Sequence, residues 1–345
     1  MTQTMKALIL KEGGYATQKP DSIILSDMNP FVEYGDLPVE ELDEGMVRIK
    51  VSLASVNPSD EMFVQGLYGQ SRIAGKAAGF EGVGEVVESG GGAIADGLKG
   101  MRVAFVAAPK GQGSWSEYAI ADASTCIPLI DGVRDEDGAA MIVNPLTALA
   151  MFDIVKEEGE KSFIVSAGAS QLCKLMIAQA KEEGYRPIAL VRRDDQIEPL
   201  KALGAAHVIN ITSDDFDSEF RAICKSEKPR IFLDAVSNQL SAKVFNMMGR
   251  GARWVIYGKL DEELPTLLEP GQMIFMSKRI EGFWLTKWMM EKPLADKMTT
   301  IQQAQKNFAS GAWQTDVTAI IPLADAIARL PEELAKPNGK VFIAP

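Results

Sequence analysis

From Ser162 onward, strand-like and helix-like stretches alternate regularly, and this alternation constrains the fold more than any other feature. Short apolar runs predict strands at Ser162–Ala167, Pro187–Val191, His207–Asn210, Arg230–Val236 and Arg253–Tyr257. The stretches between them predict helices at Gln171–Glu183, Gln196–Leu203, Phe216–Lys225 and Gln239–Met248. Because crossovers of this length join parallel strands, the sequence predicts an α/β fold with a doubly wound parallel sheet.

The first third of the chain has a different pattern. Val47, Ile49, Val51 and Leu53 alternate with polar residues, as expected for a half-buried strand. Glycine-rich breaks separate further apolar runs at Lys6–Leu10, Ile23–Leu25, Gly84–Val87 and Arg102–Ala107. We therefore expect a small β-barrel or sandwich here.

The remaining segments join these two regions and close the chain. Asp135–Asp137 precede helix formers that run to Lys156. Near the C-terminus, the pattern predicts a helix at Leu294–Ala309 and a final strand at Lys340–Ala344.

Length and charge limit the classes of function. The 345 residues suggest about two domains. A net charge of −11 disfavours binding to nucleic acid or docking on an anionic membrane. No window resembles a membrane span, and the apolar run Ala7–Leu10 is too short for the core of a signal peptide. We therefore expect a cytoplasmic protein.

The cysteines and the histidine limit the metal chemistry. Cys126, Cys173 and Cys224 are widely spaced and odd in number, which is typical of reduced thiols rather than a disulfide framework. The single histidine, His207, excludes any site that needs two histidines. Its place at a strand start favours a structural role.

The first strand–helix turn of the predicted parallel sheet is a candidate nucleotide site. It reads Gly168, Ala169, Ser170, Gln171, Leu172, Cys173, so the first glycine of a G-x-G-x-x-G pattern is present and the other two are replaced. Serine and cysteine are small, and a helix N-terminus attracts phosphate whatever its side chains are. The alternative is an ordinary turn of a parallel sheet.

The end of the next strand bears on cofactor choice. A carboxylate there would bind the ribose 2′-hydroxyl of NAD. Instead Arg192 and Arg193 follow the strand, and guanidinium groups suit a 2′-phosphate. This favours NADP(H) over NAD(H). The alternative is a solvated charge cluster in which Asp194 and Asp195 balance the charges of the two arginines.

Several short motifs, in this order and spacing, resemble the medium-chain dehydrogenase/reductase superfamily. They are Val56–Asp60, Gly79–Val86, Gly113–Tyr118, Asn144–Ala148, Leu203–Ala205, Tyr257–Gly258 and Gly282–Leu285. The resemblance is to the zinc-independent branch of quinone oxidoreductases and 2-enoyl thioester reductases. The runs Gly282–Trp288 and Gln65–Tyr68 are most similar to the enoyl thioester reductases.

The resemblance implies a fold and an assembly. It implies a GroES-like β-barrel catalytic domain at 1–135 and 280–345, and a Rossmann nucleotide-binding domain with a six-stranded sheet at 136–279. A homodimer through the edge of the nucleotide domain is also implied. Asn57 and Phe80 stand where the zinc-dependent branch has Cys and His, so no metal is expected.

Two residues are implied as catalytic. Tyr68 matches the tyrosine of the enoyl reductases, and a phenol can stabilise an enolate or protonate the α-carbon of the substrate. The alternative for Tyr68 is an ordinary loop aromatic. Asn57 matches an asparagine near the nicotinamide ribose. The alternative for Asn57 is an Asx turn before Pro58.

Further residues are implied around the cofactor and the substrate. Thr147, Tyr257, Gly258, Phe283 and Leu285 match positions that contact the cofactor, and packing is the alternative for each. Trp284 and Trp288 are candidates for lining the substrate cleft. Tryptophans with this spacing are more often core or interface residues.

These inferences predict an NADPH-dependent oxidoreductase that transfers hydride to a small-molecule acceptor, an activated C=C bond or a quinone, without zinc. If the acceptor is a quinone, Tyr68 is dispensable. The alternative from another class is a non-catalytic or cofactor-binding scaffold, because Gln171 and Cys173 replace glycines of the turn.

Overall fold

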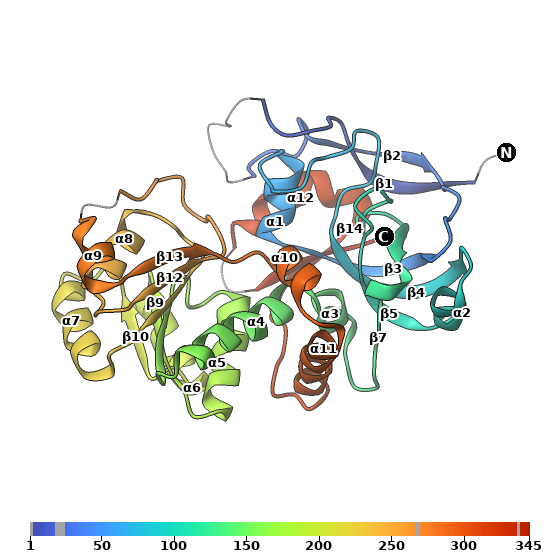
Figure 1. Cartoon of the computed structure of the whole chain (residues 1–345). Coiled ribbons are helices and arrows are strands. Elements are labelled where there is room, and N and C mark those ends of the chain that lie inside the picture. The colour runs from blue at the N-terminus through green and yellow to red at the C-terminus, as the bar shows by residue number, and fades with distance from the viewer. Residues whose placement is uncertain (1–2, 18–24, 267–268, 337–338) are drawn as a thin grey trace. The chain divides into compact units, whose positions relative to one another are not determined.

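The computed structural model describes residues 3–17, 25–266, 269–336 and 339–345 (Figure 1). The chain divides into two compact units. The first unit contains Met1–Pro145 and Ile301–Pro345, and the second contains Leu146–Thr300. The assignment of domains to 1–135 with 280–345 and to 136–279 stays a prediction.

The second unit is built on a parallel sheet. Its strands are β8 (Ser162–Val165), β9 (Arg186–Val191), β10 (His207–Asn210), β11 (Ile231–Asp234), β12 (Arg253–Ile256) and β13 (Arg279–Gly282). Their order is β10-β9-β8-β11-β12-β13, and every neighbouring pair is parallel. The order reverses between β8 and β11, where ligands bind in doubly wound sheets. The predicted fold class is confirmed.

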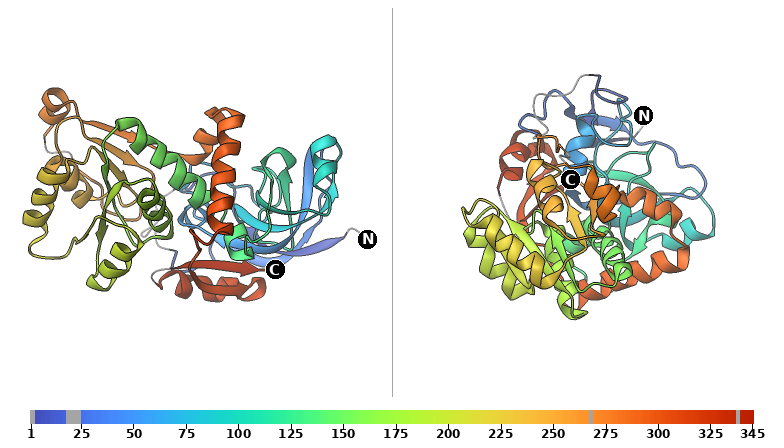
Figure 2. Two further views of the ribbon diagram at one scale, coloured as in Figure 1. Left: turned by 90° about the horizontal axis from the view of Figure 1, so that it is seen from below. Right: turned by 60° about the vertical axis from the view of Figure 1, so that its left-hand side comes forward.

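Helices cover both faces of this sheet (Figures 1 and 2). They are α5 (Gln171–Glu182), α6 (Ile197–Leu203), α7 (Phe216–Glu227) and α8 (Gln239–Met247). Phe220 of α7 and Phe245 of α8 pack in one cluster with the strand residues Ile164, Phe232 and Trp254. Since side chains alternate along a strand, the neighbours of these strand residues face the helices on the other side.

A hydrogen-bond network around Glu227 joins the first residues of β8, β9 and β10 to the end of α7. Its carboxylate accepts from Ser162 Oγ at 2.7 Å, from Arg186 Nε and Nη2 at 2.9 and 2.6 Å, and pairs with His207 Nε2 at 2.8 Å. His207 therefore has a structural partner in the protein.

Replacing Glu227 with glutamine is expected to lower the free energy of unfolding by about 1–3 kcal/mol at pH 7, because Ser162, Arg186 and His207 lose a charged partner. The hydrogen bond from Arg186 holds the pKa of this carboxyl well below its ordinary value of 4.5. A lowered folded-state pKa stabilises the fold above the unfolded-state pKa, and this stabilisation is lost as the pH falls. Denaturant unfolding should therefore show the gap between wild type and variant narrowing from pH 7 towards pH 3. Glu198→Gln, which changes an exposed pair with Lys201, is the control and should have little effect.

The first unit contains a two-stranded and a seven-stranded sheet. Antiparallel β1 (Thr4–Leu10) and β2 (Val32–Pro38) form the small one. The large sheet has the order β14-β15-β3-β4-β5-β7, with β6 also paired to β3. Its strands are β3 (Met46–Val56), β4 (Glu81–Ser89), β5 (Arg102–Val106), β6 (Tyr118–Asp122), β7 (Ile127–Pro128), β14 (Val317–Pro322) and β15 (Lys340–Ala344). The strand expected at Ile23–Leu25 lies outside the described residues, except for Leu25.

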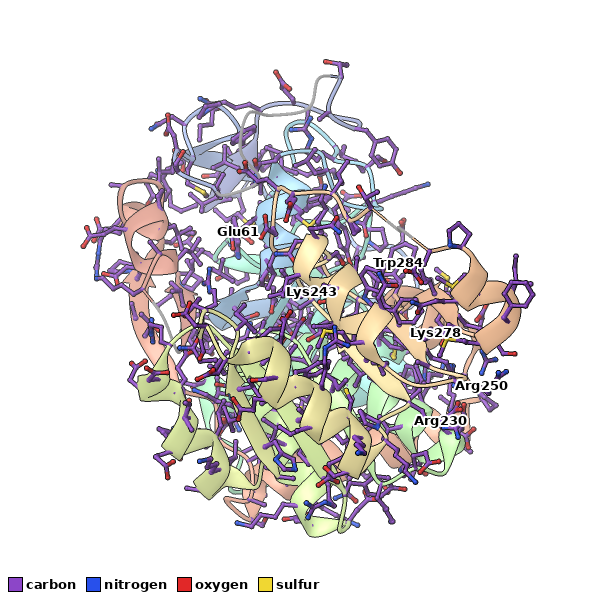
Figure 3. All side chains as sticks on the ribbon, turned by 90° about the vertical axis from the view of Figure 1, so that its left-hand side faces the viewer. Glu61, Arg230, Lys243, Arg250, Lys278 and Trp284 are labelled. Carbon is purple, nitrogen blue, oxygen red and sulfur yellow. The ribbon has the colours of Figure 1, made fainter. Side chains whose placement is uncertain are left out.

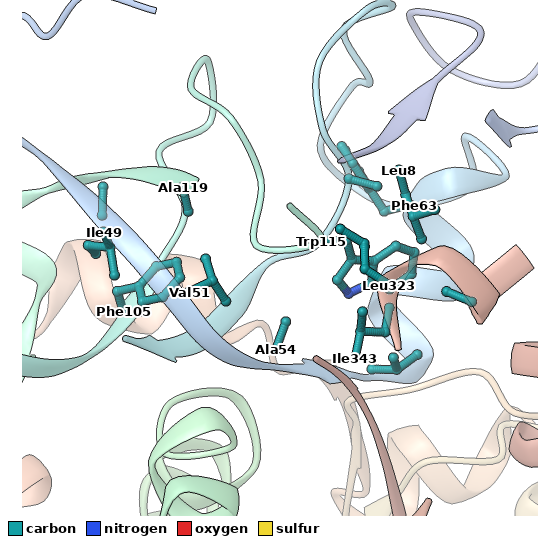
Figure 4. Packing of buried hydrophobic residues seen from close by; sticks show 14 of the residues in the cluster. Leu8, Ile49, Val51, Ala54, Phe63, Phe105, Trp115, Ala119, Leu323 and Ile343 are labelled. Carbon is teal, nitrogen blue, oxygen red and sulfur yellow. The ribbon is translucent and has the colours of Figure 1, made fainter. Parts of the chain in front are cut away.

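Figure 4 shows part of the core of this unit. Trp115 and Phe105 are fully buried and pack with Leu8, Val51 and Ile343. Two register shifts interrupt the pairing of β3 with β4, and such irregularities bend a sheet. The C-terminal strand β15 pairs with β3, so the end of the chain completes the sheet begun by its first third.

The remaining helices are short, apart from α4 and α11. They are α1 (Pro58–Val64), α2 (Ala93–Leu98), α3 (Asp135–Ala139), α4 (Val143–Glu158), α9 (Gly271–Met276), α10 (Leu285–Glu291), α11 (Leu294–Ala309) and α12 (Ala326–Leu334). The helix expected after Asp135 is thus two helices, α3 and α4. Within the described ranges, no helix is long and apolar enough to cross a membrane.

Candidate active site

The turn between β8 and α5 keeps the close packing that a nucleotide-binding turn needs. The N–H of Gly168 donates to Leu190 O of β9 at 2.9 Å. A Cβ at residue 168 would lie 2.8 Å from the Ala189 side chain, so only glycine fits against this strand. Ala169 and Gln171 on either side of Ser170 are half-buried, and Leu172 is buried.

The two replaced glycines of the turn have local partners. Ser170 is the N-cap of α5, and its Oγ accepts from Cys173 N at 3.3 Å. The Cys173 thiol lies 3.3 Å from Ser166 O and 3.6 Å from the Tyr257 hydroxyl. Cys173 is fully buried, and this burial raises the pKa of its thiol. Cysteine is therefore small enough to keep helix α5 against the end of β8.

Asp234, at the end of β11, organises the switch point between β8 and β11. Its carboxylate accepts from Ser166 Oγ at 2.5 Å and from Trp254 Nε1 at 2.8 Å. It also accepts from the backbone N–H groups of Val236 and Ser237. These bonds fix the loop after β11 beside the turn at Gly168.

Tyr257 and Gly258 follow β12 at the same edge of the sheet. The hydroxyl of Tyr257 lies beside the Cys173 thiol, and burial raises the pKa of Tyr257 well above 10. A Cβ at Gly258 would lie 2.9 Å from Ala235 O, and Gly258 O accepts from Ser237 Oγ at 2.9 Å. The Tyr257 side chain thus packs on the turn, and the predicted cofactor contacts of both residues stay predictions.

Arg192 and Arg193 follow β9 directly and differ in their partners. Arg193 Nε donates to Asp195 at 3.0 Å, whereas Asp194 accepts from Asn210 Nδ2 at 2.7 Å. Arg192 is exposed, and the ion pairs within the described part of the chain do not include it, but its charge acts on the Asp261 carboxylate. Asp195 therefore pairs with Arg193 only, whereas Arg192 interacts with Asp261.

The segment after β13 carries four of the predicted residues. Phe283 N donates to Ile256 O at 2.8 Å, so this N–H is already hydrogen-bonded to strand β12. Leu285 begins α10, where the first N–H groups have no partner within the helix. Trp284 is the N-cap of α10 and is exposed, and Trp288 is half-buried with Lys292 Nζ over its ring.

Thr147 lies in the first half of α4 and is buried. Its predicted contact with the nicotinamide stays a prediction. The role of Trp284 and Trp288 in lining a substrate cleft also stays a prediction.

Tyr68 lies in the loop after α1, on an aromatic stack of the first unit. Its ring packs against Phe80 with centroids 5.2 Å apart and an angle of 47° between the planes. Phe80 packs in turn against Phe63 of α1, at 4.8 Å and 50°. Phe80 therefore supports the Tyr68 ring.

Arg72 holds the other end of this loop. Its guanidinium is buried and donates to Val64 O at 2.9 Å and to Gly14 O at 3.2 Å. The backbones of Gly14 and Arg72 also bond to each other. The loop that carries Tyr68 is therefore fixed at both ends.

Asn57 is 1% exposed, and both hydrogens of its amide have acceptors. Nδ2 donates to Ser55 Oγ at 3.0 Å and to Glu81 Oε1 at 2.9 Å, and Oδ1 accepts from Lys340 Nζ. Asn57 is also the N-cap of α1, in a capping box with Asp60. The catalytic role of Asn57 stays a prediction.

Asp60 ties Asn57 to the aromatic stack. Its carboxylate accepts from Asn57 N and from Phe80 N, both at 2.9 Å. Burial raises the pKa of Asp60 to about 7, against the opposing effect of the bond from Asn57 N. Burial also lowers the pKa of Lys340.

Sequence reasoning did not single out Ser55, Asp60, Glu81 or Lys340 as site residues. Asp60 and Glu81 belong to motifs on which the family resemblance rests, but the motifs alone indicated no role for either residue. Lys340 comes from the C-terminal strand, and no local pattern indicated it.

Among the described residues, no group of three or more His, Cys, Asp or Glu side chains could hold a metal ion. Independence from zinc stays a prediction.

Comparisons with known proteins agree with the two units. The family model of the alcohol dehydrogenase GroES-like domain matches residues 43–131, and that of the zinc-binding dehydrogenases matches residues 172–300. The first match confirms the GroES-like assignment of the first unit.

Similar proteins narrow the family. A provisionally assigned NADPH:quinone reductase from Mesorhizobium loti, known from its crystal structure, is 55% identical, with a TM-score of 0.95, and the match covers 100% of this chain and 99% of that chain. The mitochondrial enoyl-acyl-carrier-protein reductase of Bos taurus is 28% identical over 267 residues, which are 74% of this chain and 69% of the bovine protein. The mitochondrial 2-enoyl thioester reductase heterodimer of Candida tropicalis shares the fold at 20% identity, with a TM-score of 0.79 over 99% of this chain and 100% of that chain. The chain therefore belongs to the medium-chain dehydrogenase/reductase superfamily, in its branch of NAD(P)H-dependent quinone and enoyl reductases.

Proposed function

We propose that this protein is a zinc-independent, NADPH-dependent reductase of α,β-unsaturated carbonyl compounds, with enoyl thioesters and enones as its substrate class. The observation that carries the proposal is Tyr68, whose ring packs on Phe80, which in turn packs on Phe63, in a loop fixed at both ends. A phenol held in this way is a donor of the kind that an enolate requires.

The residues of the second unit fit a dinucleotide. Gly168 lets the turn before α5 pass close to β9, the N-terminus of α5 favours a phosphate, and Ser170 keeps a hydroxyl hydrogen for donation after capping the helix. Arg192 and Arg193 would hold a 2′-phosphate. When bound, the nicotinamide supplies the hydride. Relatives support this choice, since a mycobacterial neighbour, Rv1454c, was solved with NADPH.

Tyr68 would act on the substrate rather than on the cofactor. As the β-carbon gains hydride, negative charge develops on the carbonyl oxygen, and the Tyr68 hydroxyl donates to that oxygen or to the α-carbon. Phe80 and Arg72 would keep the hydroxyl in place, because one supports its ring and the other its loop.

Fluorescence titration with NADPH and with NADH, followed by a panel of enoyl thioesters, enones and quinones, tests the proposal. We expect tighter binding of NADPH and turnover of the unsaturated carbonyl compounds. Turnover of quinones alone would indicate a quinone reductase. Failure to bind either nucleotide would favour the non-catalytic scaffold on the same fold.

We also propose a homodimer through strand β13, and a cytoplasmic location. β13 is an edge strand of the sheet. Arg279 N donates to Ala252 O and Phe283 N donates to Ile256 O, on the side of β12. Because N–H groups alternate along a strand, the N–H of Ile280 points away from β12. Large apolar side chains are exposed on and beside this strand, among them Ile280 and Phe275, the latter 73% exposed. Figure 3 shows this side, with Arg250, Lys278 and Trp284 labelled. The opposite edge strand, β10, exposes no large apolar side chain.

In light scattering after gel filtration, the wild type should show about twice the chain mass of 37.4 kDa. Ile280→Lys should shift the protein towards the monomer, because charge on an edge strand opposes pairing. Ile320→Lys, on the edge strand β14 of the first unit, is the matched control and should stay dimeric. A wild-type monomer would contradict the dimer.

A further inference from the structure

A group of buried polar side chains surrounds Asn57 in the first unit. It comprises Ser55, Asn57, Asp60, Glu81 and Lys340, which we call the Asn57 cluster, and each member is at most 5% exposed. Burying two carboxylates and an ammonium group is costly unless each is paired or hydrogen-bonded. Apolar side chains of similar size would fill the same space without this cost, which favours a functional role for the cluster.

The amide of Asn57 lies between a cation and an anion. Lys340 Nζ donates to its oxygen, and its nitrogen donates to Glu81 Oε1 at 2.9 Å. A flipped amide would place two donors together at Lys340 and two acceptors together at Glu81. The cluster therefore permits one orientation of this amide only.

Glu81 also reaches a second element. Its other oxygen, Oε2, accepts from Ile142 N at 3.1 Å and from Val143 N at 2.8 Å. These groups stand at the start of α4, where a carboxylate is favoured by the unpaired N–H groups and the helix dipole. Thr147 follows on the same helix, one turn later.

We propose that Glu81 and Lys340 are positioning residues: together they hold the Asn57 amide in one orientation, and Glu81 fixes the first turn of α4 against it. This inference rests on the proposed function and on the prediction, implied by the family resemblance, that Asn57 and Thr147 contact the cofactor. Asp60 connects the Asn57 cluster to the aromatic residues, because its carboxylate accepts from both Asn57 N and Phe80 N, and Phe80 packs against the Tyr68 ring.

The test uses Glu81→Gln, Lys340→Met and the double variant. Each single change alters the net charge of the cluster, whereas the double change keeps the net charge by removing one anion and one cation together. Both single variants should lower the Tm and reduce kcat tenfold or more, with KM for NADPH changed less than threefold. The double variant should recover at least half of the lost Tm without recovering kcat, since the Asn57 amide stays unoriented.

A second readout does not depend on activity. The side-chain amide protons of Asn57, assigned in NMR spectra with Asn57→Ala, should be protected from exchange in the wild type and exchange at least tenfold faster in each variant. If the wild type reduces no acceptor, the proposed function fails while this measurement still decides the positioning role.

Asp137→Asn is the matched control. Asp137 is a buried carboxylate of the same unit that accepts from Arg134 at 2.7 and 2.9 Å and from Thr315 N at 2.9 Å. Its replacement should lower the Tm and leave kcat unchanged. Recovery of kcat together with Tm in the double variant, or unchanged amide exchange in the single variants, would overturn the proposal. If Glu81→Gln does not fold, Lys340→Met and the exchange measurement decide alone.

Discussion

Replacing Tyr68 with phenylalanine is expected to lower kcat for enoyl thioester reduction about 100-fold, the lower end of the effect of losing a general acid. The phenyl ring of the variant would keep the packing on Phe80, so the loop and the fold should persist. KM for NADPH should change little, because only the hydroxyl is removed. Steady-state kinetics with an enoyl thioester, together with Tm, measures the effect.

Tyr15→Phe is the matched control for this prediction. Tyr15 is 57% exposed, and its hydroxyl donates to Gly69 O at 3.3 Å, in the same loop as Tyr68. Loss of this hydroxyl should leave kcat within about threefold, since an exposed neutral hydrogen bond contributes little. A Tyr68→Phe enzyme that retains wild-type kcat for enoyl thioesters would remove Tyr68 from the chemistry. Retention for quinones alone would instead agree with hydride transfer that needs no acid.

Regular spacing explains which elements were predicted well. The helix Leu294–Ala309 has the predicted bounds because its apolar residues recur every three or four positions. The strand Lys340–Ala344 has them because it is a short, continuous apolar run. Strand β13 was missed, since Arg279, Ile280, Glu281 and Gly282 include a single large apolar residue. Its strand form depends on pairing with β12, and such pairing is invisible in a local pattern.

The candidate site was predictable only where its residues lie close in sequence. The turn from Gly168 to Cys173 is one local motif, and the structure keeps it compact. The Cys173 thiol in this turn contacts the hydroxyl of Tyr257, which is 84 residues away, and no spacing rule links the two residues. Lys340 is further still from Asn57, at 283 residues. Contacts of this range follow from the sheet that brings β15 beside β3, so they emerge from the fold and not from a motif.

Replacing both Arg192 and Arg193 with alanine is expected to weaken NADPH binding about 100-fold or more, because hydrogen bonds to charged groups contribute about 1.5–3 kcal/mol each. NADH affinity should change less than threefold, since NADH has no 2′-phosphate. Arg192→Ala should have the larger single effect. Arg193 must first leave Asp195, to which it donates at 3.0 Å, whereas Arg192 interacts with Asp261 through its charge and not through an ion pair among the described residues.

Two further variants separate a specific phosphate contact from a general effect of charge. Asp195→Asn weakens the competitor of Arg193, and it should therefore tighten NADPH binding severalfold without affecting NADH. Lys201→Ala removes an exposed positive charge from α6, where Lys201 pairs with Glu198, and should leave both affinities nearly unchanged. Fluorescence titration of each variant with both nucleotides gives the ratio of the two affinities. An equal loss of NADPH and NADH binding in the double alanine variant would mean that the arginines support the loop after β9, and the preference for NADPH would then have to come from other residues.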